Sequence, residues 1–413
     1  MKIKRLMTIA VMVATLVACT KGEIVYEETG SEIGFRPVAG ASTKAPVYGP
    51  QGGQDGDTYD QGEAFGVFAY HKVLASGAAS AAWTDFAADA GTMNTYIDGG
   101  RFAYDAANSA WAGQKADGGD NPYYWPKTGV LAFAGYSPWG ITGTVAVDVP
   151  TAAQSPKLTV SGFTQGTYTC TTGTTPVNNT VDLMWFDADD QNAVNLTGSA
   201  TTRSVAVIFR HACSWIDFNL SPAADADKGK FKILKVTLKN VYTKGSFDSG
   251  KCAETVTNDK SVPWTAYGFS SAAAGKADIV LYDVAAGVFL GTPAAQTSAA
   301  AVDVLQLNGL IAIPQDLELV AADEEAGTEA KDPTSLEIVY QQYTVADGQT
   351  PNQETISFRL TGSDTVGTDP ITDHGSWLYG RHYTYNITFG LQEILISPSI
   401  IDWTDETPVS MNN

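Results

Sequence analysis

Residues 232–241 read Lys-Ile-Leu-Lys-Val-Thr-Leu-Lys-Asn-Val, an alternation of apolar side chains with lysines. A period of two is typical of a half-buried β-strand, because successive side chains point to opposite faces of a sheet. Similar runs, rich in β-branched and aromatic residues and bounded by turn-forming residues, recur at 65–70, 130–136, 205–220, 336–340, 355–360 and 383–389. No segment sustains a long helical period, although the Ala-rich stretch 75–90 is compatible with a short helix. The sequence therefore predicts an all-β protein with two antiparallel β-sandwich domains and short helical insertions.

The length of 413 residues also favours two domains. Asp, Asn, Gly, Ser and Thr crowd together between residues 186 and 203, and this composition predicts a domain boundary. We expect an N-terminal β-sandwich over 45–195 and a C-terminal β-sandwich over 196–413.

The N-terminus has the pattern of an export signal. Lys2, Lys4 and Arg5 precede an apolar run from Leu6 to Val17. At 1.5 Å per residue this run reaches roughly 18 Å, which is short for a membrane span and suits a signal peptide. It ends in Leu-Val-Ala-Cys, a bacterial lipobox pattern that predicts a signal peptide over 1–18 and lipidation of Cys19. The alternative is an ordinary secretory signal followed by an unrelated cysteine.

The net charge of −20 disfavours nucleic acid and anionic lipid as partners. Beyond Cys19 the chain has only Cys170, Cys213 and Cys252, which allow at most one intramolecular disulfide. We therefore expect the fold to be stabilised by its apolar core rather than by covalent cross-links.

Residues suited to catalysis are sparse. Four histidines occur, at positions 71, 211, 374 and 382, and none belongs to a metal-binding or hydrolase motif. We interpret His211 as a hydrogen-bonded core residue. Acidic clusters at Asp55, Asp57, Asp60 and Glu63, and at Asp187, Asp189 and Asp190, do not match the EF-hand spacing and leave calcium binding open. The sequence predicts no enzyme, no cofactor and no metal site.

Five aromatic residues lie close together in sequence: Trp111, Tyr123, Tyr124, Trp125 and Trp139. They suit the core of the first domain, and the alternative is a sugar-binding surface on it.

The succession of motifs along the chain resembles the fimbrillins of Bacteroidales, the Mfa-like group whose members are lipoprotein subunits of type V pili. The segments that carry the resemblance are the lipobox, Phe35-Arg36, Thr43-Lys44-Ala45, Tyr123-Tyr124-Trp125-Pro126, Leu131 to Pro138, Asp182 to Trp185, Phe209 to Ala212, Ile216 to Phe218, Val236 to Gly245, Ile311 to Gln315, Trp377 to Ile387, and Ile400 to Trp403. Together they span nearly the whole chain.

The resemblance implies two transthyretin-like sandwiches and an assembly route. Such subunits reach the outer membrane surface as lipoproteins, and a trypsin-like protease removes the lipidated N-terminal segment with its first strand. A strand of the next subunit then fills the vacated groove. Here the removed segment is 19–44, and its short apolar strand contains Ile33 and Phe35. Cleavage is expected between Lys44 and Ala45; Arg36 is the second candidate, disfavoured because Pro37 follows it.

The donor strand is expected at the C-terminus, with Ile400, Ile401 and Trp403 as its apolar residues. Residues 404–413 are mostly polar, which leaves a tip or anchor subunit open. The predicted function is a structural or tip subunit of an adhesive cell-surface pilus, with other pilin subunits, the protease and a host or bacterial surface glycan or protein as partners. The alternative is a permanently anchored surface lipoprotein that binds host or dietary glycans.

Overall fold

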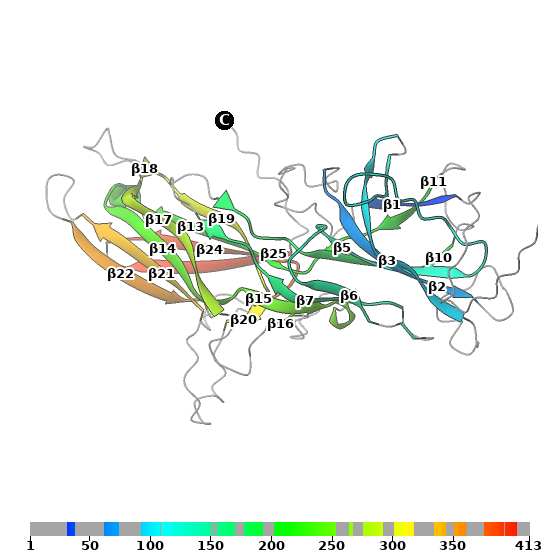
Figure 1. Ribbon diagram of the computed structural model, residues 1–413. Helices are drawn as coiled ribbons and strands as arrows, with labels where there is room; N and C mark the ends of the chain where they lie inside the picture. Colours follow the sequence, from blue (N-terminus) through cyan, green and yellow to red (C-terminus); the bar gives the residue numbers. More distant parts are fainter. Residues whose placement is uncertain are drawn as a thin grey trace, which may run out of the picture.

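The part of the chain that the structure describes folds almost entirely into β-strands, as Figure 1 shows. The computed structural model describes residues 31–37, 62–73, 92–107, 109–148, 150–151, 155–169, 177–192, 202–252, 264–266, 276–291, 301–317, 334–343, 351–360, 376–391 and 393–402. Its helical residues there form two 3₁₀ turns, η2 (Asp225–Asp227) and η3 (Ser249–Lys251). The predicted all-β class with short helical insertions is confirmed, while the Ala-rich stretch 75–90 lies outside the described residues.

An eight-stranded sheet forms the first lobe. Its order is β11 (Thr202–Val207), β1 (Glu32–Pro37), β4 (Ala110–Gly113), β3 (Thr92–Asp105), β2 (Phe65–Val73), β5 (Val130–Ser137), β10 (Met184–Gln191) and β12 (Arg210–His211). The sheet curls on itself, because Phe35 of β1 contacts Phe133 of β5 and Phe186 of β10 although β4, β3 and β2 separate these strands in the order. The aromatic core lies inside this curl.

Two facing sheets form the second lobe, which we call the sandwich lobe. One has the order β19 (Leu305–Ala312), β13 (Ser214–Pro222), β24 (Arg381–Phe389) and β25 (Ile394–Asp402). The other has the order β18 (Ala301–Val302), β17 (Lys276–Leu290), β14 (Phe231–Tyr242), β21 (Ser335–Gln342) and β22 (Asn352–Arg359). Apolar side chains from both sheets form one core between them.

Strand β14 contains the Lys-Ile-Leu-Lys repeat, and its burial follows the sequence pattern with one interruption. Ile233, Val236 and Leu238 are fully buried, whereas Leu234 is only half-buried. The pairing of β14 with both neighbours shifts between Ile233 and Lys235, and this bulge resets the alternation.

A four-stranded middle sheet joins the lobes. It has the order β16 (Trp264–Ala266), β15 (Lys244–Asp248), β7 (Leu158–Thr164) and β6 (Thr144–Val147), and it lies between the two larger units in Figure 1. Val160 and Phe163 of this sheet share a core with Tyr136 of the first lobe and Ile311 of β19. The lobes are therefore connected through packed apolar side chains as well as through the chain.

Two small strand pairs complete the fold, β8 (Tyr168–Thr169) with β9 (Val177–Asn178) and β20 (Gln315–Asp316) with β23 (Ser376–Trp377). Cys213 is buried and Cys252 half-buried, and both are free thiols. Cys170 lies outside the described residues.

The boundary predicted between residues 195 and 196 falls within the strand set of the first lobe. Strands β11 and β12 follow this position and still pair with β1 and β10, which precede it. Conversely, β7 precedes it and pairs with β15. A polar connection between two strands of one sheet has the same composition as a linker between domains, so composition alone does not distinguish the two.

Candidate strand-exchange site

Strand β1 lies between two strands that are distant from it in sequence. It runs parallel to β11 over six residue pairs, from Glu32 with Thr202 to Pro37 with Val207. On its other side it is antiparallel to β4, where Phe35 faces Trp111. Two further backbone hydrogen bonds link this segment to the loop before β5: Ile33 N donates to Tyr123 O at 2.7 Å and Trp125 N to Ser31 O at 3.0 Å.

The side chains of Ile33 and Phe35 point into the core of the first lobe, and both have 0% exposure. The Phe35 ring touches four other phenyl rings at centroid distances of 4.9–5.8 Å, and three of these contacts are edge-to-face. Such pairs contribute about 0.5–1.5 kcal/mol each beyond the burial of area. Strand β1 therefore supplies the centre of this core although it is only six residues long.

Strand β11 depends on β1 for its place in the sheet. It lies at the edge of the eight-stranded order, and β1 is its strand partner there. Val205 and Val207 are buried in the same core as Phe35. Loss of β1 would leave β11 without a backbone ladder in the described structure.

Glu32 adds an unfavourable charge to the docked strand. Burial raises the pKa of its carboxyl, and the nearby Asp105 and Asp120 raise it further. The ionised form is therefore less stable in the docked strand than in water. This electrostatic cost makes β1 easier to displace than its apolar contacts alone suggest.

The two predicted processing positions differ in what the structure says of them. Arg36 has an exposed side chain, but its backbone is paired with Ala206 in the ladder between β1 and β11. A protease needs an extended, locally open segment, so the bond after Arg36 is protected in the folded subunit. Lys44 and Ala45, like Cys19, lie outside the described residues.

The predicted donor residues Ile400 and Ile401 belong to β25, at the edge of the four-stranded sheet of the sandwich lobe. Strand β25 pairs with β24 from Ile394 with Phe389 to Asp402 with Arg381. Ile400 is half-buried against the core of this lobe. Trp403 lies outside the described residues.

The first strand is thus a buried insert held by two distant partners, in an all-β molecule of three sheet units. The family model described as Fimbrillin-like matches residues 52–403, which is most of the chain. The chain belongs to the fimbrillin-like family. Membership makes it a structural, non-enzymatic pilus subunit located at the cell surface.

The solved structures to which the chain is similar are distant from it in sequence. A fimbrial protein from Bacteroides vulgatus is 16% identical with a TM-score of 0.50, over 90% of this chain and 99% of the other. The tip fimbrial protein Mfa3 from Porphyromonas gingivalis is 10% identical with a TM-score of 0.37, over 90% and 99% of the two chains. The similarity to the Bacteroides vulgatus protein supports the fold. The similarity to Mfa3 is too low to support any conclusion. Among curated proteins, none matches the sequence.

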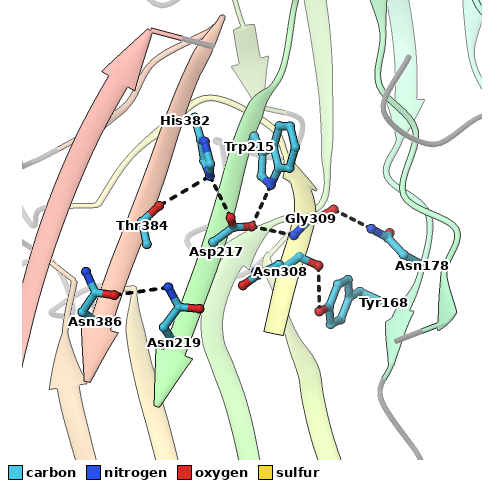
Figure 2. A network of polar contacts seen from close by, with 10 residues as sticks. All are labelled: Tyr168, Asn178, Trp215, Asp217, Asn219, Asn308, Gly309, His382, Thr384 and Asn386. Carbon is cyan, nitrogen blue, oxygen red and sulfur yellow. Dashed lines mark hydrogen bonds and ion pairs between the residues drawn. The ribbon is translucent and has the colours of Figure 1, made fainter. Parts of the chain in front are cut away.

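The histidines of this fimbrillin that the structure describes have structural partners. His211 is buried, and its Nδ1 lies 2.8 Å from Asp182 Oδ2, which confirms the prediction of a hydrogen-bonded core residue. His382 Nε2 lies 2.8 Å from Asp217 Oδ2 (Figure 2). His71 Nε2 lies 2.6 Å from Thr128 O. His374 lies outside the described residues.

The acidic clusters show no cation site in the described part of the fimbrillin. No group of three His, Cys, Asp or Glu there could hold a metal ion. Asp187 is engaged by Lys157 and Arg210 at 3.0 and 2.8 Å. Glu63 is buried, and Asp55, Asp57 and Asp60 lie outside the described residues. Equally, none of the described helices is long and apolar enough to span a membrane.

The aromatic cluster is divided between core and surface. Trp111 and Trp125 are buried in the core of the first lobe, and Tyr123 packs against it. Trp139 is 36% exposed and stacks on Tyr136. Two of the rings that a sugar-binding surface would need are therefore unavailable, which favours the core interpretation of this cluster.

The sequence indicated Ile33 and Phe35 as a short apolar strand but gave no sign of β11 as its partner. A parallel partner far along the chain leaves no local pattern, and residues 202–207 resemble any other strand.

Proposed function

We propose that this fimbrillin assembles into an adhesive pilus by protease-triggered donor-strand exchange, with β1 as the placeholder strand. The observation that carries the proposal is the complete burial of Ile33 and Phe35 in a strand at the N-terminal end of the fold. A cut between β1 and β2 leaves this strand held only by non-covalent contacts. Its departure would expose an apolar groove and two unpaired strand edges, which another strand can satisfy.

Export and anchoring precede this step in the proposal. The signal peptide 1–18 is removed, Cys19 is acylated, and the subunit reaches the cell surface as an outer membrane lipoprotein. More than one acyl chain gives a stable attachment, because each buried CH₂ contributes about 0.8 kcal/mol. A trypsin-like surface protease then cuts between Lys44 and Ala45, which removes the anchor and β1 together.

The groove sets requirements for the incoming strand. An incoming strand must run in the direction of β1, because only that direction is parallel to β11 and antiparallel to β4. A strand inserted in the opposite direction would not restore the hydrogen-bond ladders that β1 makes with these two strands. The strand must also present two large apolar side chains at positions i and i+2, in place of Ile33 and Phe35. The residue between them must be tolerated where the buried Gly34 lies.

The proposed donor is the C-terminal segment with Ile400, Ile401 and Trp403. Ile401 and Trp403 are two residues apart, as Ile33 and Phe35 are. Donation requires β25 to leave an edge position where it has one strand partner, which breaks one ladder rather than two.

Limited digestion with a Lys/Arg-specific protease tests this function. We expect a new N-terminus at Ala45 and SDS-resistant multimers. Lys44→Gln should block both results, whereas Arg36→Gln should change neither. Clipped protein that remains monomeric, alone and with a partner pilin, would refute strand exchange. Cleavage after Arg36 in the folded protein would refute the processing position.

A further inference from the structure

The outward face of the sheet β19-β13-β24-β25 carries mainly uncharged, hydrogen-bonding side chains, together with the enclosed pair of Asp217 and His382 and the exposed Leu395. In β13 the even-numbered residues Ile216, Phe218 and Leu220 enter the core, so the odd-numbered residues face outward. Pairing between the strands brings one outward residue of each into a single row: Gln306, Asn219, Asn386 and Ser397. We call these four residues the polar row. With strands about 4.8 Å apart, it extends roughly 14 Å across the sheet.

The opposite outer face of the same lobe is charged. Lys232, Lys235 and Lys239 line β14, Glu337 lies on the neighbouring β21, and Arg359 lies on β22 beyond it. Lys235 and Lys239 also pair with Asp283 and Asp278 of β17. Mixed charges are usual on a solvated face of a protein with net charge −20. The polar row therefore differs from an ordinary solvated surface.

The ionisable groups next to the polar row are enclosed. Asp217 accepts hydrogen bonds from Trp215 Nε1 at 2.7 Å and Gly309 N at 2.6 Å, and it pairs with His382 Nε2 at 2.8 Å (Figure 2). The side chains of His382 and Asp217 are only 7% and 10% exposed. They consequently present little charge to a ligand on this face.

The polar row has hydrogen-bonding capacity left over. Asn219 Nδ2 donates to Asn386 Oδ1 at 3.2 Å, which leaves the Nδ2 group of the exposed Asn386 facing solvent. The exposed Gln306, Asn386 and Ser397 add amide and hydroxyl groups in the same row.

An aromatic shelf lies on the same face, four residues before Asn219 on β13 and four before Asn386 on β24, about 13 Å from the polar row. The rings of Trp215 and His382 stack with centroids 4.6 Å apart at an angle of 22°, and both bond to Asp217. In Figure 2 these rings, Asn219 and Asn386 project from β13 and β24. Trp215 also packs against the core between the lobes and is half-buried, so the shelf offers the part of its ring that stays exposed as an apolar surface.

From this arrangement we propose that the polar row and its aromatic shelf bind a neutral oligosaccharide. Sugar hydroxyls both donate and accept, which matches amide and hydroxyl side chains, and a sugar ring has an apolar face that packs on an aromatic surface. A polyanion would require exposed basic residues, which this face lacks among its described outward positions. The proposal rests on the cell-surface location of the proposed pilus subunit but not on strand exchange.

The test uses the full chain on an array of neutral oligosaccharides built from glucose, galactose, mannose and N-acetylglucosamine, with sulfated forms for comparison. The best neutral ligand is then titrated by calorimetry. Asn386→Asp is nearly isosteric at an exposed position, and we expect it to weaken binding at least about tenfold. Ser397→Asp should have a similar effect. Ser357→Asp, exposed on the outer side of β22 in the charged sheet, is the matched control and should bind as the parent does.

Three results would overturn the proposal: no neutral ligand on the array, equal binding by Asn386→Asp, or tighter binding of the sulfated forms. Loss of self-association rather than of sugar binding in Asn386→Asp would also overturn it, and would identify the face as a contact between copies. Asn386→Asp should still form multimers after cleavage at Lys44. Failure of the sugar site is therefore distinguishable from failure of the pilus function.

Discussion

At the scale of single residues, the stability of the first lobe depends most on Phe35. Replacing a buried phenylalanine by alanine costs about 3–5 kcal/mol, through lost burial and the cavity left behind. We expect Phe35→Ala to lower the free energy of unfolding by that amount in urea denaturation. Arg36→Ala changes an exposed side chain of the same strand and should remain within about 0.5 kcal/mol of the parent. Equal effects of the two substitutions would mean that β1 is not part of the core.

Glu32 makes the docking of β1 pH-dependent. Its pKa is raised in the folded state by burial and then by Asp105 and Asp120, so the folded state binds the proton more tightly than the unfolded state. Stability is therefore highest below the ordinary pKa of a glutamate. The stability of the folded state falls as the pH rises through the raised pKa of Glu32, and it stays lower at higher pH.

Glu32→Gln should consequently raise the melting temperature near neutral pH and have little effect in mild acid. Glu393→Gln, at an exposed glutamate of the sandwich lobe, should change the melting temperature at neither pH. A loss of stability at neutral pH in Glu32→Gln would show that the carboxylate is favourable in the docked strand.

The roles of some residues could be predicted from the sequence, and those of others could not. Ile33, Phe35 and the core role of His211 follow from local apolar context. The aromatic cluster could not be divided in advance, because the burial of Trp111 and the exposure of Trp139 depend on strands distant from both. The polar row could not be predicted either, because its four residues come from four different strands and become neighbours only when those strands pair.

At the scale of elements, the pairing of β11 with β1 gives a specific prediction. If protease treatment displaces β1, the amides of Thr202–Val207 lose their ladder and should exchange much faster with solvent. Strand β5 is paired on both sides, with β2 and β10, and should keep its protection. A synthetic peptide of residues 31–37 should restore protection in β11. Slow exchange in β11 after β1 has left would show that side-chain packing alone holds it.

The elements themselves were largely predictable, but their neighbours were not. Continuous apolar runs located β2 and β5, which are buried on both faces, and period-two patterns located β14, β21 and β24, which have one face in a core. These patterns do not predict which strands pair with one another, because the backbone hydrogen bonds between strands do not depend on the identity of the side chains. The parallel pair β1–β11 and the joining of β7 to β15 are consequences of tertiary packing that no local window contains.

At the scale of the whole molecule, three ionic side chains connect the first lobe to the middle sheet. Asp187 lies on β10, and its two oxygens bind Arg210 of β12 at 2.8 Å and Lys157, directly before β7, at 3.0 Å. Burial alone would raise the pKa of Asp187, but the hydrogen bonds and charges of Arg210 and Lys157 outweigh this effect and lower it. The folded state therefore favours the carboxylate.

This connection should make the junction of the lobes sensitive to acid. A lowered pKa contributes stability above the ordinary value for an aspartate, and the contribution is lost as the pH falls through the lowered value. Asp187→Asn removes the charge from two half-buried contacts, and we expect a loss of about 1–2 kcal/mol near neutral pH. Asp225→Asn, at an ion pair in which Asp225 is 95% exposed, should leave the free energy of unfolding nearly unchanged. Urea unfolding of both variants over a range of pH measures the difference. If Asp187→Asn and the parent converge in acid, the ionic contact stabilises the junction; a constant difference at every pH would assign the loss to packing instead.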